Sequence, residues 1–263
     1  MHTPSMIHET ALLAGQDALA GGYILMTLRA PKTVALARPG QFVHLRIPGL
    51  GTAALRRPFS IYNAQDEILS IVYKRVGRGT EHLSTLPVGT PLDLIGPLGN
   101  GFPALREGAL PVLVAGGYGV APLHFLARAL PAQGHLFAGG RTAADVLCIE
   151  AFEKLGWTTH VATEDGSLGT RGRVTDALLP WQAERPATAL DFFSCGPAGL
   201  LKALADNLRG TPHPVWISLD KHMVCGVGAC LACVQKIKLS DGAVAQLRVC
   251  HDGPVFEARS VAW

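Results

Sequence analysis

The most informative stretch of the chain is Cys225-Gly226-Val227-Gly228-Ala229-Cys230-Leu231-Ala232-Cys233, which a fourth cysteine, Cys250, follows at a distance. The spacing C-x4-C-x2-C with a later fourth cysteine is typical of a plant-type [2Fe–2S] cluster. Four thiolates must converge on two irons, and Gly226 and Gly228 allow a loop to wrap around them and aim N–H groups at the sulfurs. We therefore expect an iron–sulfur site on Cys225, Cys230, Cys233 and Cys250, with Cys250 following a hairpin centred on Asp241-Gly242.

Two other uses of four cysteines compete with this interpretation. A structural zinc site usually takes two short Cys-x2–4-Cys pairs, and Cys250 has no cysteine close to it in sequence. Disulfides are typical of secreted chains, and residues 1–22 do not have the pattern of a signal peptide. The two remaining cysteines, Cys148 and Cys195, fit free thiols in a reducing compartment, so we expect a cytoplasmic protein.

The composition indicates a globular protein with a large core. The 263 residues suffice for two domains and a small third one, and 48% of them are hydrophobic while 16% are charged. The net charge is only +3 and the basic residues are dispersed, which argues against nucleic-acid binding. An uncharged run at 108–127 has roughly the length of a membrane span, but its prolines and glycines favour a buried strand–turn–helix, so we expect no membrane segment.

Residues 1–106 are predicted to form an antiparallel β-barrel, because short β-rich segments at 22–28, 41–47, 60–62 and 68–76 alternate with turns. Two motifs stand out in it. In Arg57-Pro58-Phe59-Ser60, the arginine could bind a phosphate and the serine could hydrogen-bond the edge of a flat ring. Alternatively, an arginine before proline can be a solvated strand end. Tyr73–Thr80 places cations and glycines before a helix predicted at 81–86, which suits a phosphate or simply makes a charged turn.

From residue 107 the pattern changes to strands alternating with helices. Strands are predicted at 112–115, 136–138, 159–162, 190–194 and 215–218, and helices at 122–130, 144–155, 174–179 and 198–208. This alternation predicts a parallel sheet with helices on both faces, whose ligands bind beyond the carboxyl ends of the strands. The glycine-rich turn at 116–122 lies at such an end without being a G-x-G-x-x-G fingerprint.

Cys195, in Ser194-Cys195-Gly196-Pro197, ends another of these strands. It is either an inert buried thiol or a neighbour of a nicotinamide ring. The loop that starts at Glu164 is equally compatible with a charged loop and with a loop facing a ribose. A single arginine, Arg141, is weak evidence for a 2′-phosphate, so NAD is expected rather than NADP.

Taken together, these motifs resemble the ferredoxin-reductase family: Arg-Pro-x-Ser in a flavin barrel, then Gly-Gly-x-Gly-x-Ala-Pro and Cys-Gly-Pro in a nucleotide domain. The C-terminal cysteine module, closing with residues 249–256, narrows the resemblance to the electron-transfer subunits of NAD-dependent dihydroorotate dehydrogenases. The resemblance covers nearly the whole chain. One departure is His222, which stands where arginine is common in relatives and leaves the four cysteines intact.

The resemblance implies three cofactors and a division into a flavin barrel at 1–106, a nucleotide domain at 107–213 and a [2Fe–2S] module at 214–263. It implies NAD near Gly117, Gly119 and Cys195, the last counted as the catalytic residue, and the cluster on the four cysteines. It implies FAD on Arg57, Pro58, Phe59, Ser60, Tyr73, Lys74, Val76, Gly79 and Thr80.

The function implied by the resemblance is electron transfer in pyrimidine biosynthesis. A partner subunit containing FMN would oxidise dihydroorotate, and electrons would pass through the cluster and FAD to NAD+. We expect a heterotetramer with two copies of each subunit. Two alternatives remain open: a subunit of the same build that serves a hydrogenase, a sulfide dehydrogenase or a ferredoxin oxidoreductase, and a zinc-stabilised nucleotide-binding module without enzymatic activity.

Overall fold

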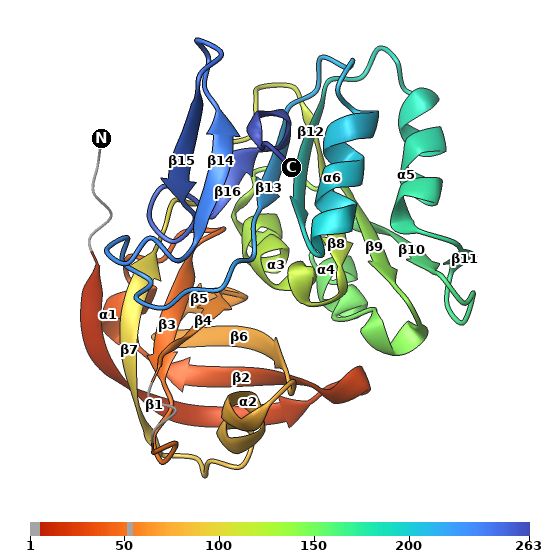
Figure 1. Ribbon diagram of the computed structural model, residues 1–263. Coiled ribbons are helices and arrows are strands. Elements are labelled where there is room, and N and C mark those ends of the chain that lie inside the picture. Colours follow the sequence, from red (N-terminus) through yellow and green to blue (C-terminus); the bar gives the residue numbers. More distant parts are fainter. Residues whose placement is uncertain (1–5, 52–54) are drawn as a thin grey trace.

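The first part of the chain folds into one curled antiparallel sheet. The computed structural model describes residues 6–51 and 55–263, and in it seven strands pair in the order β4-β3-β7-β1-β2-β6-β5 (Figure 1). Since β4 and β5 are the two edges of this sheet, the predicted barrel is present as a half-barrel. Its strands are β1 (Ile7–Ala18), β2 (Tyr23–Arg29), β3 (Phe42–Arg46), β4 (Arg57–Ser60), β5 (Asn63–Gln65), β6 (Ile68–Lys74) and β7 (Pro91–Leu98).

Three strands and one helix boundary of the half-barrel differ from the sequence prediction. The strands β1, β5 and β7 were not predicted, and in the long β1 polar residues interrupt the apolar pattern. One of these, Glu9, is buried and accepts hydrogen bonds from the backbone N–H and the hydroxyl of Thr33, next to the short helix α1 (Pro31–Val34). The helix predicted at 81–86 is α2 (Arg78–Leu83), so it begins three residues earlier.

The second sheet is parallel except for one edge strand. Its order is β11-β10-β9-β8-β12-β13-β16, and only β16 runs antiparallel to its neighbour β13. The predicted helix at 144–155 is wrong in extent, because Cys148 has φ 58° and leaves only the short helix α4 (Ile149–Glu153). The strands are β8 (Leu110–Gly116), β9 (His135–Gly140), β10 (Thr158–Thr163), β11 (Thr170–Arg171), β12 (Leu190–Cys195), β13 (Val215–Ser218) and β16 (Val255–Glu257).

Helices cover both faces of this parallel sheet, as the alternating pattern predicts. Val112 and Val114 of β8 share one core with α5 (Val174–Ala183) and α6 (Ala198–Asn207). Leu113 and Ala115, which alternate with them, share another core with α3 (Val120–Ala129) and α4. Period-two alternation along a strand thus serves two helical layers.

The C-terminal residues form one hairpin and then rejoin the parallel sheet. Strands β14 (Val234–Lys238) and β15 (Val244–Arg248) make that hairpin, and the turn at Asp241-Gly242 joins them as predicted. The residues after Cys250 return to the parallel sheet as β16 (Figure 1). The boundaries at 106 and 213 stay predictions.

Several contacts join the half-barrel to the rest of the chain. The ring of Tyr62 stacks on His124 of α3 with ring centres 4.1 Å apart, and Asn100 donates hydrogen bonds to the backbone carbonyls of His251 and Asp252. None of the helices in the described part of the chain is long and apolar enough to cross a membrane.

Candidate functional site

A cavity of about 270 Å³ lies where the half-barrel meets the parallel sheet, and both predicted flavin motifs contribute to its wall. Strands β4 and β6, which carry the two motifs, contact each other within the half-barrel. The predicted residues that line this flavin cavity are Arg57, Pro58, Phe59, Ser60, Tyr73, Lys74, Val76 and Thr80.

Gly79, which the sequence also assigned to the flavin, does not line the cavity but lies directly behind Arg57. A Cβ built on Gly79 would lie 3.3 Å from Arg57 Nε, so the glycine leaves room for the guanidinium. The Thr80 hydroxyl accepts a hydrogen bond from the Val76 N–H at 2.9 Å and closes the turn beside it. The guanidinium of Arg57, next to this turn, fits the phosphates of FAD. The aromatic side chains in the wall of the cavity fit its flat ring.

Lys74 differs from the other predicted flavin residues because it reaches the parallel-sheet part of the molecule. Its Nζ lies 3.3 Å from Asp145 Oδ1 and 4.4 Å from the centre of the Tyr23 ring. Hydrogen bonds to Asp145 and Tyr23 outweigh the effect of burial and raise the pKa of Lys74. Lys74 lines both the flavin cavity and the neighbouring pocket, so it is a charged link between them.

The neighbouring pocket, of about 560 Å³, lies at the carboxyl ends of β8, β9 and β10, where the fold predicts a nucleotide. Gly117 lines it with φ 54°, and Glu164 and Arg141 lie at its far side. Gly119 does not line this nucleotide pocket. A Cβ on Gly119 would lie 2.0 Å from the carbonyl oxygen of Cys195, so its role in the structure is the close packing of two loops.

Tyr118, which the sequence analysis passed over, lines both the flavin cavity and the nucleotide pocket. Its hydroxyl donates a hydrogen bond to Asp220 Oδ2 at 3.0 Å. This bond joins the glycine-rich turn at 116–122 to the segment that precedes residues 225–233, which we call the cysteine loop. Burial and the adjacent carboxylate raise the pKa of Tyr118, so the hydroxyl stays protonated at neutral pH. Tyr118 therefore stands between the two sites.

Cys195 lies in the wall of the flavin cavity, at the end of β12, and is 7% exposed. Burial and the nearby Asp220 carboxylate raise the pKa of the thiol to about 12. A thiol with this pKa is not a nucleophile at neutral pH. The structure places Cys195 among the residues that line the flavin cavity and not among those that line the nucleotide pocket. Its predicted position beside the nicotinamide ring stays a prediction.

The four predicted cluster ligands lie in one region and form two pairs. The Cys250 N–H donates to Cys233 Sγ at 3.4 Å, and the Cys230 side chain lies close enough to Cys225 to contribute to the lowered pKa of that thiol. In the described part of the chain no three His, Cys, Asp or Glu side chains are arranged to hold one metal ion. Two pairs suit the two irons of a [2Fe–2S] cluster.

Backbone N–H groups point at these sulfurs. The Val227 N–H donates to Cys225 Sγ at 3.5 Å and the Gly228 N–H to Cys250 Sγ at 3.2 Å. Burial opposes the ionisation of Cys225, but the backbone N–H groups around it prevail and lower the pKa of its thiol. Such donors favour the thiolate form that binds iron, so the loop fits a cluster.

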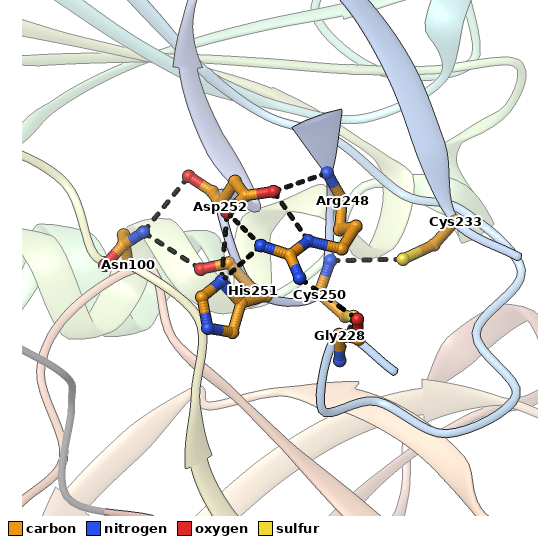
Figure 2. Close-up of polar contacts among 7 residues, drawn as sticks. All are labelled: Asn100, Gly228, Cys233, Arg248, Cys250, His251 and Asp252. Carbon is orange, nitrogen blue, oxygen red and sulfur yellow. Dashed lines mark hydrogen bonds and ion pairs between the residues drawn. The ribbon is translucent and has the colours of Figure 1, made fainter. Parts of the chain in front are cut away.

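An arginine next to Cys250 holds the cysteine loop in shape (Figure 2). Arg248 donates to both carboxylate oxygens of Asp252 at 3.0 Å, and its Nη1 donates to the Gly228 carbonyl at 3.1 Å. Asn100 then ties His251 and Asp252 to the end of the half-barrel. The sequence analysis gave none of these residues a role; the i, i+4 spacing of Arg248 and Asp252 was the available signal.

Comparison with known proteins agrees with this arrangement. A family model for the iron–sulfur cluster binding domain of dihydroorotate dehydrogenase B matches residues 220–262, and one for the oxidoreductase NAD-binding domain matches residues 113–206. A solved structure of an NADH-dependent reduced ferredoxin–NADP oxidoreductase superposes with a TM-score of 0.84 at 28% identity, covering 97% of this chain and 90% of the other. The fold and sites thus define a ferredoxin-reductase-like oxidoreductase with an added iron–sulfur domain.

The particular family follows from the curated relatives. The electron transfer subunit of dihydroorotate dehydrogenase B (NAD(+)) from Bacillus caldolyticus is 40% identical over 96% of this chain and 98% of the relative. The corresponding subunit from Geobacillus kaustophilus gives the same identity and coverage. This chain belongs to the family of dihydroorotate dehydrogenase B electron transfer subunits, which confirms the resemblance, the fold class and the oxidoreductase assignment made from the sequence.

Proposed function

We propose that this chain carries electrons between a partner that oxidises dihydroorotate and NAD+, as part of pyrimidine biosynthesis. The observation that carries the proposal is a shared wall between the flavin cavity and the cysteine loop. Phe42 and Met223 line the cavity, and both pack in the core that contains Cys233 and Cys250. On its other side Tyr118 joins the cavity to the nucleotide pocket. The three sites therefore follow one another across the molecule.

The residues of this chain bind and orient, and none acts as a nucleophile or a general base. FAD, when bound, supplies both hydride exchange with nicotinamide and single-electron exchange with the cluster. Arg57 would hold a phosphate and Ser60 an edge of the ring, while Lys74 links the two binding sites electrostatically. Gly117 leaves the backbone open to the dinucleotide, and Cys195 presents a neutral thiol beside the ring.

The partner would be a dehydrogenase subunit that contains FMN, in a complex with two copies of each subunit. The surface around the exposed Cys230 favours docking there, because Val224 and Leu231 next to it are 44% and 61% exposed. Exposed apolar side chains of this kind are typical of interaction sites. A cytoplasmic location is proposed because the cysteine ligands must stay reduced to bind iron.

A second candidate function is the same electron transfer with another partner. The high structural similarity to an NADH-dependent reduced ferredoxin–NADP oxidoreductase supports it, since that match covers nearly the whole of this chain. The two candidates use the same internal sites and differ only in what docks at the cysteine loop. Identifying the electron donor therefore distinguishes them.

The test is the visible spectrum of the anaerobically purified chain in complex with the co-expressed dehydrogenase subunit. NADH should bleach both the flavin and the iron–sulfur absorbance, and dihydroorotate should produce the same change. Bleaching by NADH and reduced ferredoxin but not by dihydroorotate would favour the second candidate. A complex that contains zinc and shows no iron–sulfur absorbance would contradict both.

A further inference from the structure

His44 is a buried histidine with no hydrogen-bond partner for its ring. It lies on β3 and is 0% exposed, and neither Nδ1 nor Nε2 meets a donor or an acceptor among the described residues. Buried polar groups are nearly always paired, so an unpaired imidazole needs an explanation. An imidazole ring carries at least one N–H that it can donate.

Strand β3 presents His44 toward the cysteine loop. Val43 and Leu45, on either side of it, pack in the half-barrel core, while Phe42, on the same face as His44, lines the flavin cavity and packs in the core of the cluster cysteines. Across the ladder, His44 pairs with Pro58 of the flavin motif. Strand β3 therefore lies beside the flavin strand β4 in the sheet, and its His44 faces the cysteine loop.

The ring of His44 lies directly against the glycine that follows the first cluster cysteine. A Cβ built on Gly226 would lie 2.5 Å from His44 Nδ1, and Gly226 has φ 71°, so both the space and the backbone conformation require glycine. The Cys225 carbonyl is near enough to the ring to favour its protonated form, but no hydrogen bond of normal geometry is present. The half-barrel thus contacts the loop at its first cysteine.

We propose that His44 is a positioning residue for electron transfer: its ring packs against Gly226, and when the cluster is bound its unpaired N–H donates to the Cys225 carbonyl and thereby fixes the cluster relative to the flavin. The inference rests on the proposed function, because it requires both cofactors. A donor at this carbonyl also orients the peptide N–H groups that follow it in the loop, and hydrogen bonding around cluster sulfurs sets the reduction potential. His44 would therefore affect both the potential of the cluster and the rate at which it is reduced.

Two variants of similar size separate hydrogen bonding from packing. His44→Asn keeps an N–H donor close to the position of Nδ1, and His44→Leu keeps only the volume. With the intact complex holding FAD and the cluster, anaerobic stopped-flow absorbance follows flavin reduction by NADH and then cluster reduction. For His44→Leu we expect unchanged flavin reduction, cluster reduction slower by roughly tenfold or more, and a shifted electron paramagnetic resonance spectrum and midpoint potential.

His44→Asn should restore most of the rate, the spectrum and the potential. Equal behaviour of the Asn and Leu variants would overturn the proposal. If neither variant folds, Gly226→Ala serves as a third variant, because its added methyl group would contact the His44 ring from the loop side. This variant should also show slow cluster reduction. A native rate and spectrum in Gly226→Ala would overturn the proposal. Failure of NADH to reduce the flavin of the unmodified complex would instead contradict the proposed function, a result visible before any variant is made.

Discussion

The flavin cavity and the cysteine loop are built in different ways. Strands β4 and β6 contribute seven of the residues that line the cavity, and their backbones are fixed by sheet hydrogen bonds. The cysteine loop and the segment before it, residues 219–233, contain no helix or strand, and one of the four cluster ligands, Cys230, is exposed. The loop is held by groups outside it, including Arg248 and the β3 face. We therefore expect the cavity to keep its shape without its cofactor and the loop to depend on its metal.

Removing a cluster ligand is expected to have the largest effect. Cys230→Ser should abolish the cluster signal in electron paramagnetic resonance and the NAD+-linked turnover of the complex, because a serine hydroxyl is a poor replacement for a thiolate on iron. Flavin content and the reduction of the flavin by NADH should remain. Cys148→Ser, at a cysteine outside the site, is the matched control and should keep both signals. Turnover that survives in Cys230→Ser would contradict a route through the cluster.

The next largest effect is expected from removing a cation in the flavin cavity. Arg57→Gln removes a cation from the proposed phosphate site and should weaken FAD binding by about 1.5–3 kcal/mol, the contribution of a hydrogen bond to a charged group. This corresponds to roughly 10- to 150-fold in the dissociation constant, measured by flavin fluorescence during titration. Arg46→Gln, at an exposed arginine of β3, is the control. Iron content should be equal in both variants, and a loss of iron in Arg57→Gln alone would mean that the two sites are not independent.

The smallest expected effect concerns the support of the loop. Arg248→Gln breaks the contacts to Asp252 and to the Gly228 carbonyl while leaving all four ligands in place. Residues that orient metal ligands typically change metal affinity by 10- to 100-fold, so iron release to a chelator should accelerate by roughly that range. Arg209→Gln, which breaks an exposed ion pair on α6, should have no such effect. Equal iron release in the two variants would show that the loop does not need this support.

Local patterns in the chain predicted the architecture and the identity of most site residues. The alternation of strands and helices after residue 107 predicted the parallel sheet, because each layer must bury one face. The strand β1 was missed, since its buried Glu9 is compensated by Thr33 twenty-four residues away, and no local pattern shows such a partner. Helix α4 was predicted too long, because the left-handed backbone at Cys148 is unusual for a residue other than glycine.

For the sites, motif chemistry identified residues but not their neighbours. The two flavin motifs were predicted to act together, and they line one cavity with Tyr118 and Phe42, which no motif included. Gly119 fits a motif, yet it packs against the Cys195 carbonyl and does not line the nucleotide pocket. The roles assigned to the site residues remain predictions that the variants above test.

The sequence by itself determined the four cysteines, the two flavin motifs and the order of the folding units, because ligand spacing and hydrophobic period are local properties. Only the tertiary structure decided how these parts meet. It placed His44 of the half-barrel against Gly226, Asn100 against His251, and Tyr118 against Asp220. These pairs are more than one hundred residues apart in the chain, so they come together only when the sheets pack, and electron transfer depends on that packing.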